Sequence, residues 1–347
     1  MASKKREVWL DVFKGILVLV MITTHCFCIY GQAAPLNTAA KVYVDACFVI
    51  GFSGFIFAYG YTNALVYFKM DRKTVAKKYL INFLRLIAAF YILAVIHRVV
   101  AEGKGLFECL PKILIFADIP TYADIMLPYA FLTLFVLVFF EQIKWILQRD
   151  WAVWLTVFVS LCFCAVPAQL IKYNIPGIFL GTYNFASFPV FAYFSLFMLG
   201  AYAQKKNLGT NITVLLCCCA AGVPLLLDLF YYKKDFDHLR FPVPTVSFLA
   251  GSAALLYLIY IACRGRLSNM GKLTDILVRF GVDIPAMLII STLLLYIIKY
   301  HIFNQPWAAR YEKSPMVWNF ITIFVLSVCQ LWIYFKPIVM AKLKKSK

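Results

Sequence analysis

Charged residues are scarce in this sequence. Only 14% of its 347 residues are Asp, Glu, Lys or Arg, whereas 63% are hydrophobic. A soluble domain carries about a quarter charged residues, and no soluble fold of this size hides so much apolar surface. The scarcity of charge therefore excludes a soluble domain and predicts a protein whose solvent is the bilayer.

Several signatures of soluble chemistry are also missing. The sequence has no zinc-type His–Glu spacing, no glycine-rich loop that cradles phosphate and no nucleophile elbow. These absences argue against proteases, ATPases and nucleotide-driven pumps. Most of the eleven cysteines lie in apolar runs, where Cys behaves as a small hydrophobic residue. We therefore predict no disulfide framework, no metal site and no bound cofactor.

Long apolar runs are what the sequence does contain. A membrane-spanning helix needs about 20 mostly apolar residues. We predict an all-α polytopic membrane protein with about ten transmembrane helices, forming a single transmembrane domain over residues 1–347. The predicted spans are Val8–Tyr30, Val44–Tyr67, Tyr79–Val100, Ile125–Phe140, Trp151–Leu170, Ser187–Ala203, Ile212–Tyr231, Pro244–Cys263, Phe280–Ile302 and Met316–Phe335.

Lys and Arg are unevenly shared between the two sides of such a protein. With the N-terminus inside, most of them fall in inside loops, which predicts an even helix count and two cytoplasmic termini. The net charge of +18 is then mainly a topology signal that faces an anionic inner leaflet, and no nucleic-acid partner is predicted. The inside groups are Lys4, Lys5 and Arg6; Lys69, Arg72, Lys73, Lys77 and Lys78; Lys144 and Arg149; Lys205 and Lys206; Arg264, Arg266, Lys272 and Arg279; and the Lys-rich tail.

Three ionisable residues in the first predicted helix form the strongest candidate site. Asp11 precedes Lys14 by three residues and can pair with it, and His25 follows Lys14 by eleven residues. Eleven residues are close to three helical turns, so Lys14 and His25 project from nearly the same face, ~16 Å apart along the axis. Ionisable groups inside a bilayer are costly and are functional candidates, and His is the usual general base near neutral pH. The alternative is structural: Lys14 extends toward the interface and His25 makes a buried hydrogen bond.

Other polar groups in or near the spans are weaker candidates. Arg85 and the pair His97–Arg98 flank the third predicted helix, where they either bind an anionic group or pair with Asp45 or Asp124. Structural pairing is at least as good an interpretation for them. We also expect the apolar stretch Phe107–Phe116, in the longest connection, to form a re-entrant or interfacial helix.

The residues from Leu10 to His25 resemble the opening of the acyltransferase-3 superfamily of integral membrane acyltransferases. Asp11, Lys14, Gly15 and His25 match the family's pattern of an Asp, a basic residue followed by Gly, and a later His. Further likenesses are Ser53–Gly54–Phe55 after a Phe-rich stretch, Arg85 in the third helix, and the stretch Phe188–Gly200, which resembles a Phe-Pro…Gly helix. The stretch Asp124–Tyr129 resembles the glucan succinyltransferase branch of this clan, and the transmembrane glucosaminide N-acetyltransferases are similar.

The sequence departs from the family pattern in two places. Many members carry an Asp six residues before the Ser of Ser-Gly-Phe, whereas Asp45 stands eight residues before Ser53. Many also carry a His in a late helix, and the corresponding region Gly281–Ser291 has none.

The resemblance implies a membrane O-acyltransferase of the cell envelope. It would move an acyl group, most simply acetyl, from cytoplasmic acyl-CoA (acetyl-CoA) to a hydroxyl of an extracytoplasmic or surface glycan, a polysaccharide modification at a bacterial inner (plasma) membrane. His25 would be the catalytic base or a transient acyl carrier, with Lys14 and secondarily Arg85 holding the donor and Asp11 orienting Lys14. The pocket-lining candidates are Ser53, Asp45, His97, Arg98 and Asp124. Membrane lipids and the glycan are the expected partners.

Two other classes of function compete with this interpretation. A transporter or flippase for a glycan or lipid-linked substrate would use the intramembrane charges as a substrate or proton path. A sensor or scaffold without chemistry would leave the face formed by Asp11, Lys14 and His25 unexplained.

Overall fold

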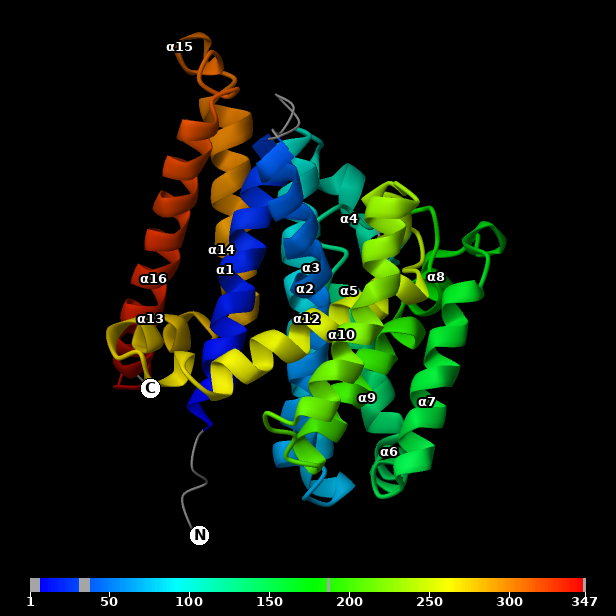
Figure 1. The fold of residues 1–347 in the computed structure, drawn as a ribbon. Coiled ribbons are helices and arrows are strands. Elements are labelled where there is room, and N and C mark those ends of the chain that lie inside the picture. The colour runs from blue at the N-terminus through cyan, green and yellow to red at the C-terminus, as the bar shows by residue number, and fades with distance from the viewer. Residues whose placement is uncertain (1–6, 31–37, 186–187, 346–347) are drawn as a thin grey trace. The chain divides into compact units, whose positions relative to one another are not determined.

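The computed structural model describes residues 7–30, 38–185 and 188–345, and in these ranges every regular element is a helix. The all-α prediction is thereby confirmed. Lys4, Lys5, Arg6 and Ser187, which entered the topology prediction, lie outside the described residues. The α-helices are α1 (Val8–Tyr30), α2 (Thr38–Thr62), α3 (Arg72–Ile96), α4 (Leu106–Leu114), α5 (Met126–Val138), α6 (Phe140–Leu147), α7 (Asp150–Cys162), α8 (Asn174–Leu180), α9 (Val190–Lys205), α10 (Ile212–Leu226), α11 (Phe236–Arg240), α12 (Val246–Arg264), α13 (Lys272–Phe280), α14 (Ile284–Ile297), α15 (Pro306–Ala309) and α16 (Pro315–Lys345) (Figure 1).

Each of the ten predicted apolar segments coincides with a helix, but not all of these helices are long. In the described ranges, seven helices are long and apolar enough to cross a membrane, and α5 with α6 makes an eighth if this pair, bent by 79°, is one broken span. Helices α7 and α9 have 13 and 16 residues and are shorter than a membrane span usually requires. The structure therefore supports seven or eight spans, while ten spans and the cytoplasmic termini remain predictions.

Four long helices end in a wider, π-helical turn. These turns continue α2, α3, α10 and α14 and are η1 (Asn63–Tyr67), η2 (His97–Ala101), η5 (Leu227–Tyr231) and η7 (Ile298–Ile302). A π turn changes the direction in which side chains leave the helix axis. The candidate pair His97–Arg98 lies in such a turn, at the end of α3.

The long connection after α3 contains the short helix that its apolar sequence predicts. Helix α4 buries Cys109 and Ile113, whereas Phe107 on its other side is 89% exposed. A short helix with one packed side and one exposed apolar residue suits a membrane interface. The expected helix is therefore present, while its re-entrant or interfacial position remains a prediction.

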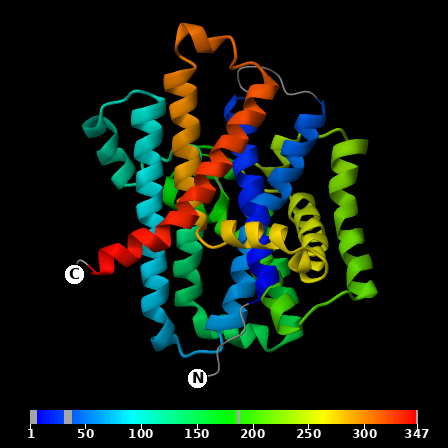
Figure 2. The same ribbon diagram turned by 90° about the vertical axis from the view of Figure 1, so that its left-hand side faces the viewer.

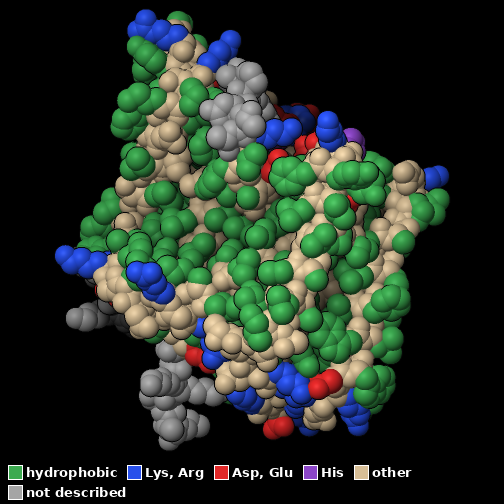
Figure 3. Space-filling model, viewed as in Figure 1, with side chains coloured by type: hydrophobic (Ala, Val, Ile, Leu, Met, Phe, Trp, Pro, Cys, Tyr) green, Lys and Arg blue, Asp and Glu red, His purple; other side chains and the backbone are tan. Residues whose placement is uncertain are grey.

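The chain divides into two compact units, residues 1–51 with 262–347 and residues 52–261. In the first unit, α1 packs against α13, α14 and α16, and Figure 2 shows α13, in gold, lying across the blue α1. In the second unit, α3 packs on α5 and α7 packs on α9. Helix α7 turns a row of exposed apolar side chains outward, and charged side chains gather at its lower end in Figure 3.

Helices α2 and α9 of the second unit touch through two glycines. A Cβ atom at Gly60 would overlap the carbonyl oxygen of Phe197, and one at Gly200 would overlap the carbonyl oxygen of Phe57. Small residues let membrane helices approach until their backbones are in contact. The Gly that ends the Phe-Pro…Gly stretch is therefore a packing residue.

Candidate functional site

The three residues that the sequence singles out in α1 all lie on one helix and are all half-buried. Asp11, Lys14 and His25 are neither fully exposed nor fully enclosed, and the remaining circumference of α1 is mostly buried. At about 100° per residue, Lys14 and His25 point within about 20° of each other. Between them on this face, Val18 and Met21 are buried. The helix thus carries a cation near one end and an imidazole about three-quarters of the way along.

Gly15, the neighbour of Lys14 in the motif, has a packing role that the sequence did not reveal. A Cβ atom at Gly15 would overlap the carbonyl oxygen of Leu277 in α13, and one at Gly281 would overlap the carbonyl oxygen of Asp11. The two glycines let the backbones of α1 and α13 touch. This crossing fixes the segment of α1 that carries Asp11 and Lys14.

The C-terminal half of α1 is held by hydrogen bonds on both sides of His25. The Cys26 thiol donates to the Trp318 carbonyl of α16 at 3.4 Å, and the Tyr30 hydroxyl donates to the Leu295 carbonyl of α14 at 3.0 Å. The Thr23 hydroxyl shares a 2.7 Å hydrogen bond with the Tyr43 hydroxyl of α2. The Nδ1 atom of His25 is shielded from solvent. Hydrogen bonds on either side of His25 therefore hold this part of α1 against its neighbours, and one ring nitrogen of His25 is kept from solvent.

Helix α14 contributes a polar pair that sequence reasoning missed. Ser291 and Thr292 are fully buried, and α14 runs alongside α1 with Leu295 at the level of Tyr30. Ser291 stands four residues before Leu295 on α14, and His25 stands five residues before Tyr30 on α1. The helical rise therefore places Ser291 near the level of His25. The Ser291 hydroxyl donates to the Leu288 carbonyl, but the buried Thr292 hydroxyl has no hydrogen-bond partner within the described residues. The signal in the sequence was a Ser-Thr pair in an otherwise apolar run.

Arg98 forms an ion network at the end of α3, and His97 lies beside it. The Arg98 guanidinium donates to Asp118 at 2.9 Å and to Glu102, and the His97 Nδ1 atom lies 3.4 Å from the Glu102 carboxylate. Arg98 thus pairs with Asp118 and Glu102 rather than with Asp45 or Asp124. This network ties the end of α3 to the connection that follows α4, which favours the structural interpretation of both residues.

Arg85 lies on the exposed face of α3. On the same face, Ile81 and Ile92 are 39% and 48% exposed. These apolar neighbours indicate a surface that meets lipid, toward which a long Arg side chain extends its charge to reach the interface. This setting favours neither a donor site nor an ion pair, so the role of Arg85 in holding a donor stays a prediction.

Asp124 is a buried carboxyl group in the turn before α5. It is 4% exposed, and its Oδ1 atom accepts a 3.0 Å hydrogen bond from the Ile125 amide. Burial raises the pKa of Asp124 to about 7, against the opposing effects of the Ile125 amide and the positive charge of Arg240. A carboxyl group that titrates near neutral pH is able to gain or lose a proton under physiological conditions.

Ser53 and Asp45, the candidates on α2, have different surroundings. Ser53 is fully buried, and its hydroxyl donates to the Ser252 hydroxyl of α12 at 3.2 Å. Asp45 is half-buried on the part of α2 that belongs to the first unit. Ser53 therefore has a helix-to-helix hydrogen bond as its structural role.

The predicted residues are divided between the two units. The first unit holds Asp11, Lys14, His25 and Asp45, and the second holds the rest. In the described ranges, no group of three His, Cys, Asp or Glu side chains gathers in a way that would hold a metal ion. The α1 face, with α13 and α14 packed against its helix, is the best-supported candidate site. Comparisons of the chain with protein families, with curated proteins and with solved structures found no match.

Proposed function

We propose that this chain is a membrane O-acyltransferase that moves an acyl group, most simply acetyl, from cytoplasmic acyl-CoA to a glycan hydroxyl on the opposite side of the membrane. The observation that supports it is the half-buried face of α1, where Asp11, Lys14 and His25 lie on a helix that is otherwise packed. Ionisable groups are costly inside a bilayer and are functional candidates for that reason. Two ionisable groups ~16 Å apart on one face suit a reaction whose substrates arrive from opposite sides.

The roles follow from the chemistry of each side chain. Lys14, a compact point charge, holds the phosphates of CoA, and Asp11, one turn earlier, orients it. His25 accepts the proton of the acceptor hydroxyl while that oxygen attacks the thioester carbonyl. The carbon–sulfur bond then breaks, and the CoA thiolate leaves and takes up the proton from His25. The alternative is a covalent route, in which His25 carries the acyl group between donor and acceptor.

The test is acyl transfer by the purified protein in liposomes, with radiolabelled acetyl-CoA and a crude glycan extract. We expect His25→Ala to lower the transfer rate by roughly 10²–10⁴-fold, the usual contribution of general acid–base catalysis. His301→Ala is the matched control, because His301 is an exposed histidine of the same unit. Transfer that survives His25→Ala would remove His25 from the chemistry. Absence of transfer by the wild type, together with glycan flux across the liposome, would favour the transporter interpretation.

A second readout separates the two routes. In a single-turnover experiment without acceptor, label that remains on the wild-type protein and disappears in His25→Ala indicates an acyl-enzyme intermediate. Label that never binds the protein, with transfer still dependent on His25, indicates direct transfer.

A further inference from the structure

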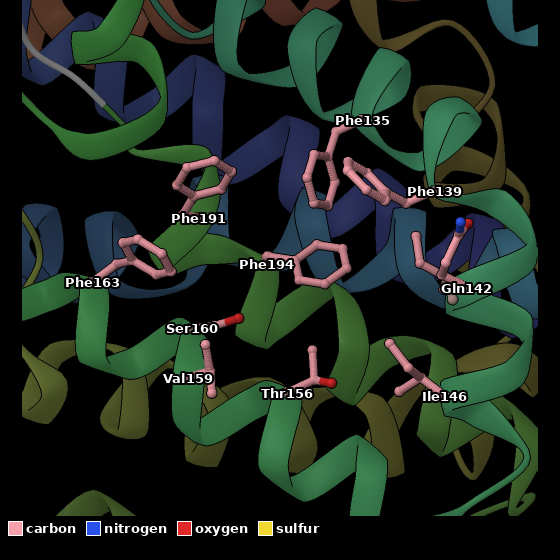
Figure 4. A pocket seen from close by; sticks show the side chains of 11 residues that line it. Phe135, Phe139, Gln142, Ile146, Thr156, Val159, Ser160, Phe163, Phe191 and Phe194 are labelled. Carbon is pink, nitrogen blue, oxygen red and sulfur yellow. The ribbon is translucent and has the colours of Figure 1, made fainter.

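The second unit contains an apolar groove that the proposed reaction does not use. Its volume is about 290 Å³, and it forms where α5 bends by 79° into α6, with α7 and α9 behind it. Five phenyl rings line it, and Figure 4 shows them around one open space. Neighbouring rings are in contact, with centroids 4.6 Å apart for Phe135 and Phe139 and 4.9 Å apart for Phe163 and Phe191.

The groove suits a hydrocarbon occupant. Val159 and Phe139 at its edge are 48% and 41% exposed, so the groove opens on the outer face of apolar helices. The hydroxyl of Thr156, one of its few polar lining residues, already donates to the Ala152 carbonyl at 2.8 Å. The lining is mostly apolar and has few hydrogen-bonding groups free to bind a ligand, so it favours an alkyl chain over a polar ligand.

Four cations lie on or just after α6 and at the end of α9, two of the helices that line the groove. We call them the basic rim, which consists of Lys144, Arg149, Lys205 and Lys206. In the part of the chain that the structure describes, Glu141 and Asp150 offset these charges, through salt bridges of 3.5 Å to Lys144 and 2.7 Å to Lys206.

Two cations of the rim contact backbone carbonyl groups. The Arg149 guanidinium donates to the Trp145 carbonyl at 3.4 Å and stacks on the Trp145 ring at 4.1 Å, and Lys205 donates to the Leu147 carbonyl. Among the described residues, neither forms a salt bridge with a carboxylate. Arg149 stands three residues beyond Ile146, which lines the groove.

We propose that the groove holds one acyl chain of an anionic membrane phospholipid, with the lipid phosphate on Arg149 and Lys205. Inside a bilayer an acyl chain gains little from entering another apolar site, because the lipid around it is equally apolar. The selectivity must therefore come from the headgroup, and a basic rim attracts a negative one. The inference does not depend on the acyl-transfer reaction.

The test uses the full chain in nanodiscs that contain a trace of photoactivatable phosphatidylglycerol or phosphatidylcholine, with labelled peptides identified by mass spectrometry. We expect phosphatidylglycerol to label peptides of α5–α7 and α9 at least about fivefold more than phosphatidylcholine does. Val159→Trp fills the mouth of the groove and lowers this labelling about tenfold. Leu155→Trp, one turn earlier on α7 and 52% exposed outside the groove, leaves it unchanged.

The headgroup contribution has its own variants. Removing one cation of the rim, by Arg149→Gln or Lys205→Gln, should weaken phosphatidylglycerol labelling about fivefold, while the exposed Lys172→Gln is neutral. Equal labelling by the two lipids, or labelling that survives Val159→Trp, would overturn the proposal. So would displacement of the label by long-chain acyl-CoA at concentrations where free phosphatidylglycerol fails to displace it.

Discussion

The two units of this protein each contain a place where helix backbones touch, and the two places differ in what surrounds the contact. In the first unit, α1 meets α13 through Gly15 and Gly281. In the second unit, α2 meets α9 through Gly60 and Gly200. In both crossings each glycine faces a backbone carbonyl of the other segment, so both pairs pack closely in the same way, through glycines that have no side chain in between.

The surroundings are different. Asp11 and Lys14 stand about one turn from Gly15, whereas rings and hydroxyls border the crossing of α2 and α9. Tyr59, for example, has its ring centroid 5.7 Å from that of Phe197, and its hydroxyl donates to the Thr133 hydroxyl at 3.1 Å. The second crossing shows that two membrane helices pack this closely without any charge. Close packing by itself therefore does not require the charges beside the first crossing, and their part in acyl transfer stays a proposal.

The largest effect should come from adding a methyl group at either crossing. Gly15→Ala and Gly200→Ala each place a Cβ atom on a backbone carbonyl that cannot move independently. We expect both to lower the free energy of unfolding by at least about 4 kcal/mol, above the usual range for overpacking. The measurement is the thermal unfolding midpoint of the detergent-solubilised protein.

The control for this pair is another helical glycine. A Cβ atom at Gly51 of α2 would meet no other atom within 4 Å, so Gly51→Ala should be neutral or stabilise by up to about 1 kcal/mol. If Gly15→Ala were as harmless as Gly51→Ala, the crossing of α1 with α13 would not be a packing contact and the comparison of the two crossings would fail.

A smaller effect, dependent on pH, is expected at Asp124 in the second unit. Burial raises the pKa of this carboxyl group from 3.8 to about 7, so the folded protein holds the proton more tightly than the unfolded chain. Its contribution to stability is complete below about pH 4 and is lost as the pH rises through 7. At about 1.4 kcal/mol for each unit of pKa, this shift corresponds to at most about 4 kcal/mol of folding stability. Relaxation of the structure around the carboxylate should reduce the contribution to about 2 kcal/mol.

Asp124→Asn keeps the shape and the acceptor for the Ile125 amide while removing the ionisation. We expect the variant to unfold at a higher temperature than the wild type at pH 8, and the two to converge near pH 4. Parallel pH profiles for the two proteins would show that Asp124 is not the titrating group. The second unit would then have no titrating carboxyl group at this position to set against the charged residues of α1 in the first unit.

Lys14→Met should separate stability from activity in the first unit. Methionine keeps most of the length and the apolar stem of the side chain, so we expect the unfolding free energy to change by less than about 1 kcal/mol. The KM for acyl-CoA should rise about tenfold with little change in kcat, because the lost charge acts in donor binding. Lys41→Met, at an exposed position of α2, is the control. A large loss of stability with an unchanged KM would make Lys14 a structural residue.

Much of the helical framework could be predicted from the sequence, because hydropathy and length alone dictate a spanning helix. The first span, Val8–Tyr30, has the predicted bounds. The bend between α5 and α6 could not be predicted, since the apolar run through Phe139 is typical of one continuous span. The π turn at His97 was hidden for a related reason: hydropathy reports burial and says nothing of helical pitch.

The candidate site was predictable only along one helix. The shared face of Lys14 and His25 follows from the helical repeat, whereas the contact of Gly15 with α13 joins residues more than 260 positions apart and has no local signal. Arg98 shows the same limit, because its pairing with Asp118 depends on where the chain returns after α4. The buried Thr292 hydroxyl was missed because a Thr in an apolar run usually bonds to its own helix.

The smallest effect is expected for Ser53, which resembles a family motif yet already has a structural partner. Ser53→Ala removes one hydrogen bond to Ser252, and such bonds between membrane helices contribute about 0.6 kcal/mol on average. We expect acyl transfer to stay within about twofold of the wild type, and a double-mutant cycle with Ser252→Ala to return a coupling below about 1 kcal/mol. A fall in transfer of tenfold or more, with stability unchanged, would instead assign Ser53 to substrate contact. A functional residue would then also lie on α2, the helix that forms the uncharged second crossing. The presence or absence of charged residues could no longer be used to tell a functional helix crossing from one that only packs.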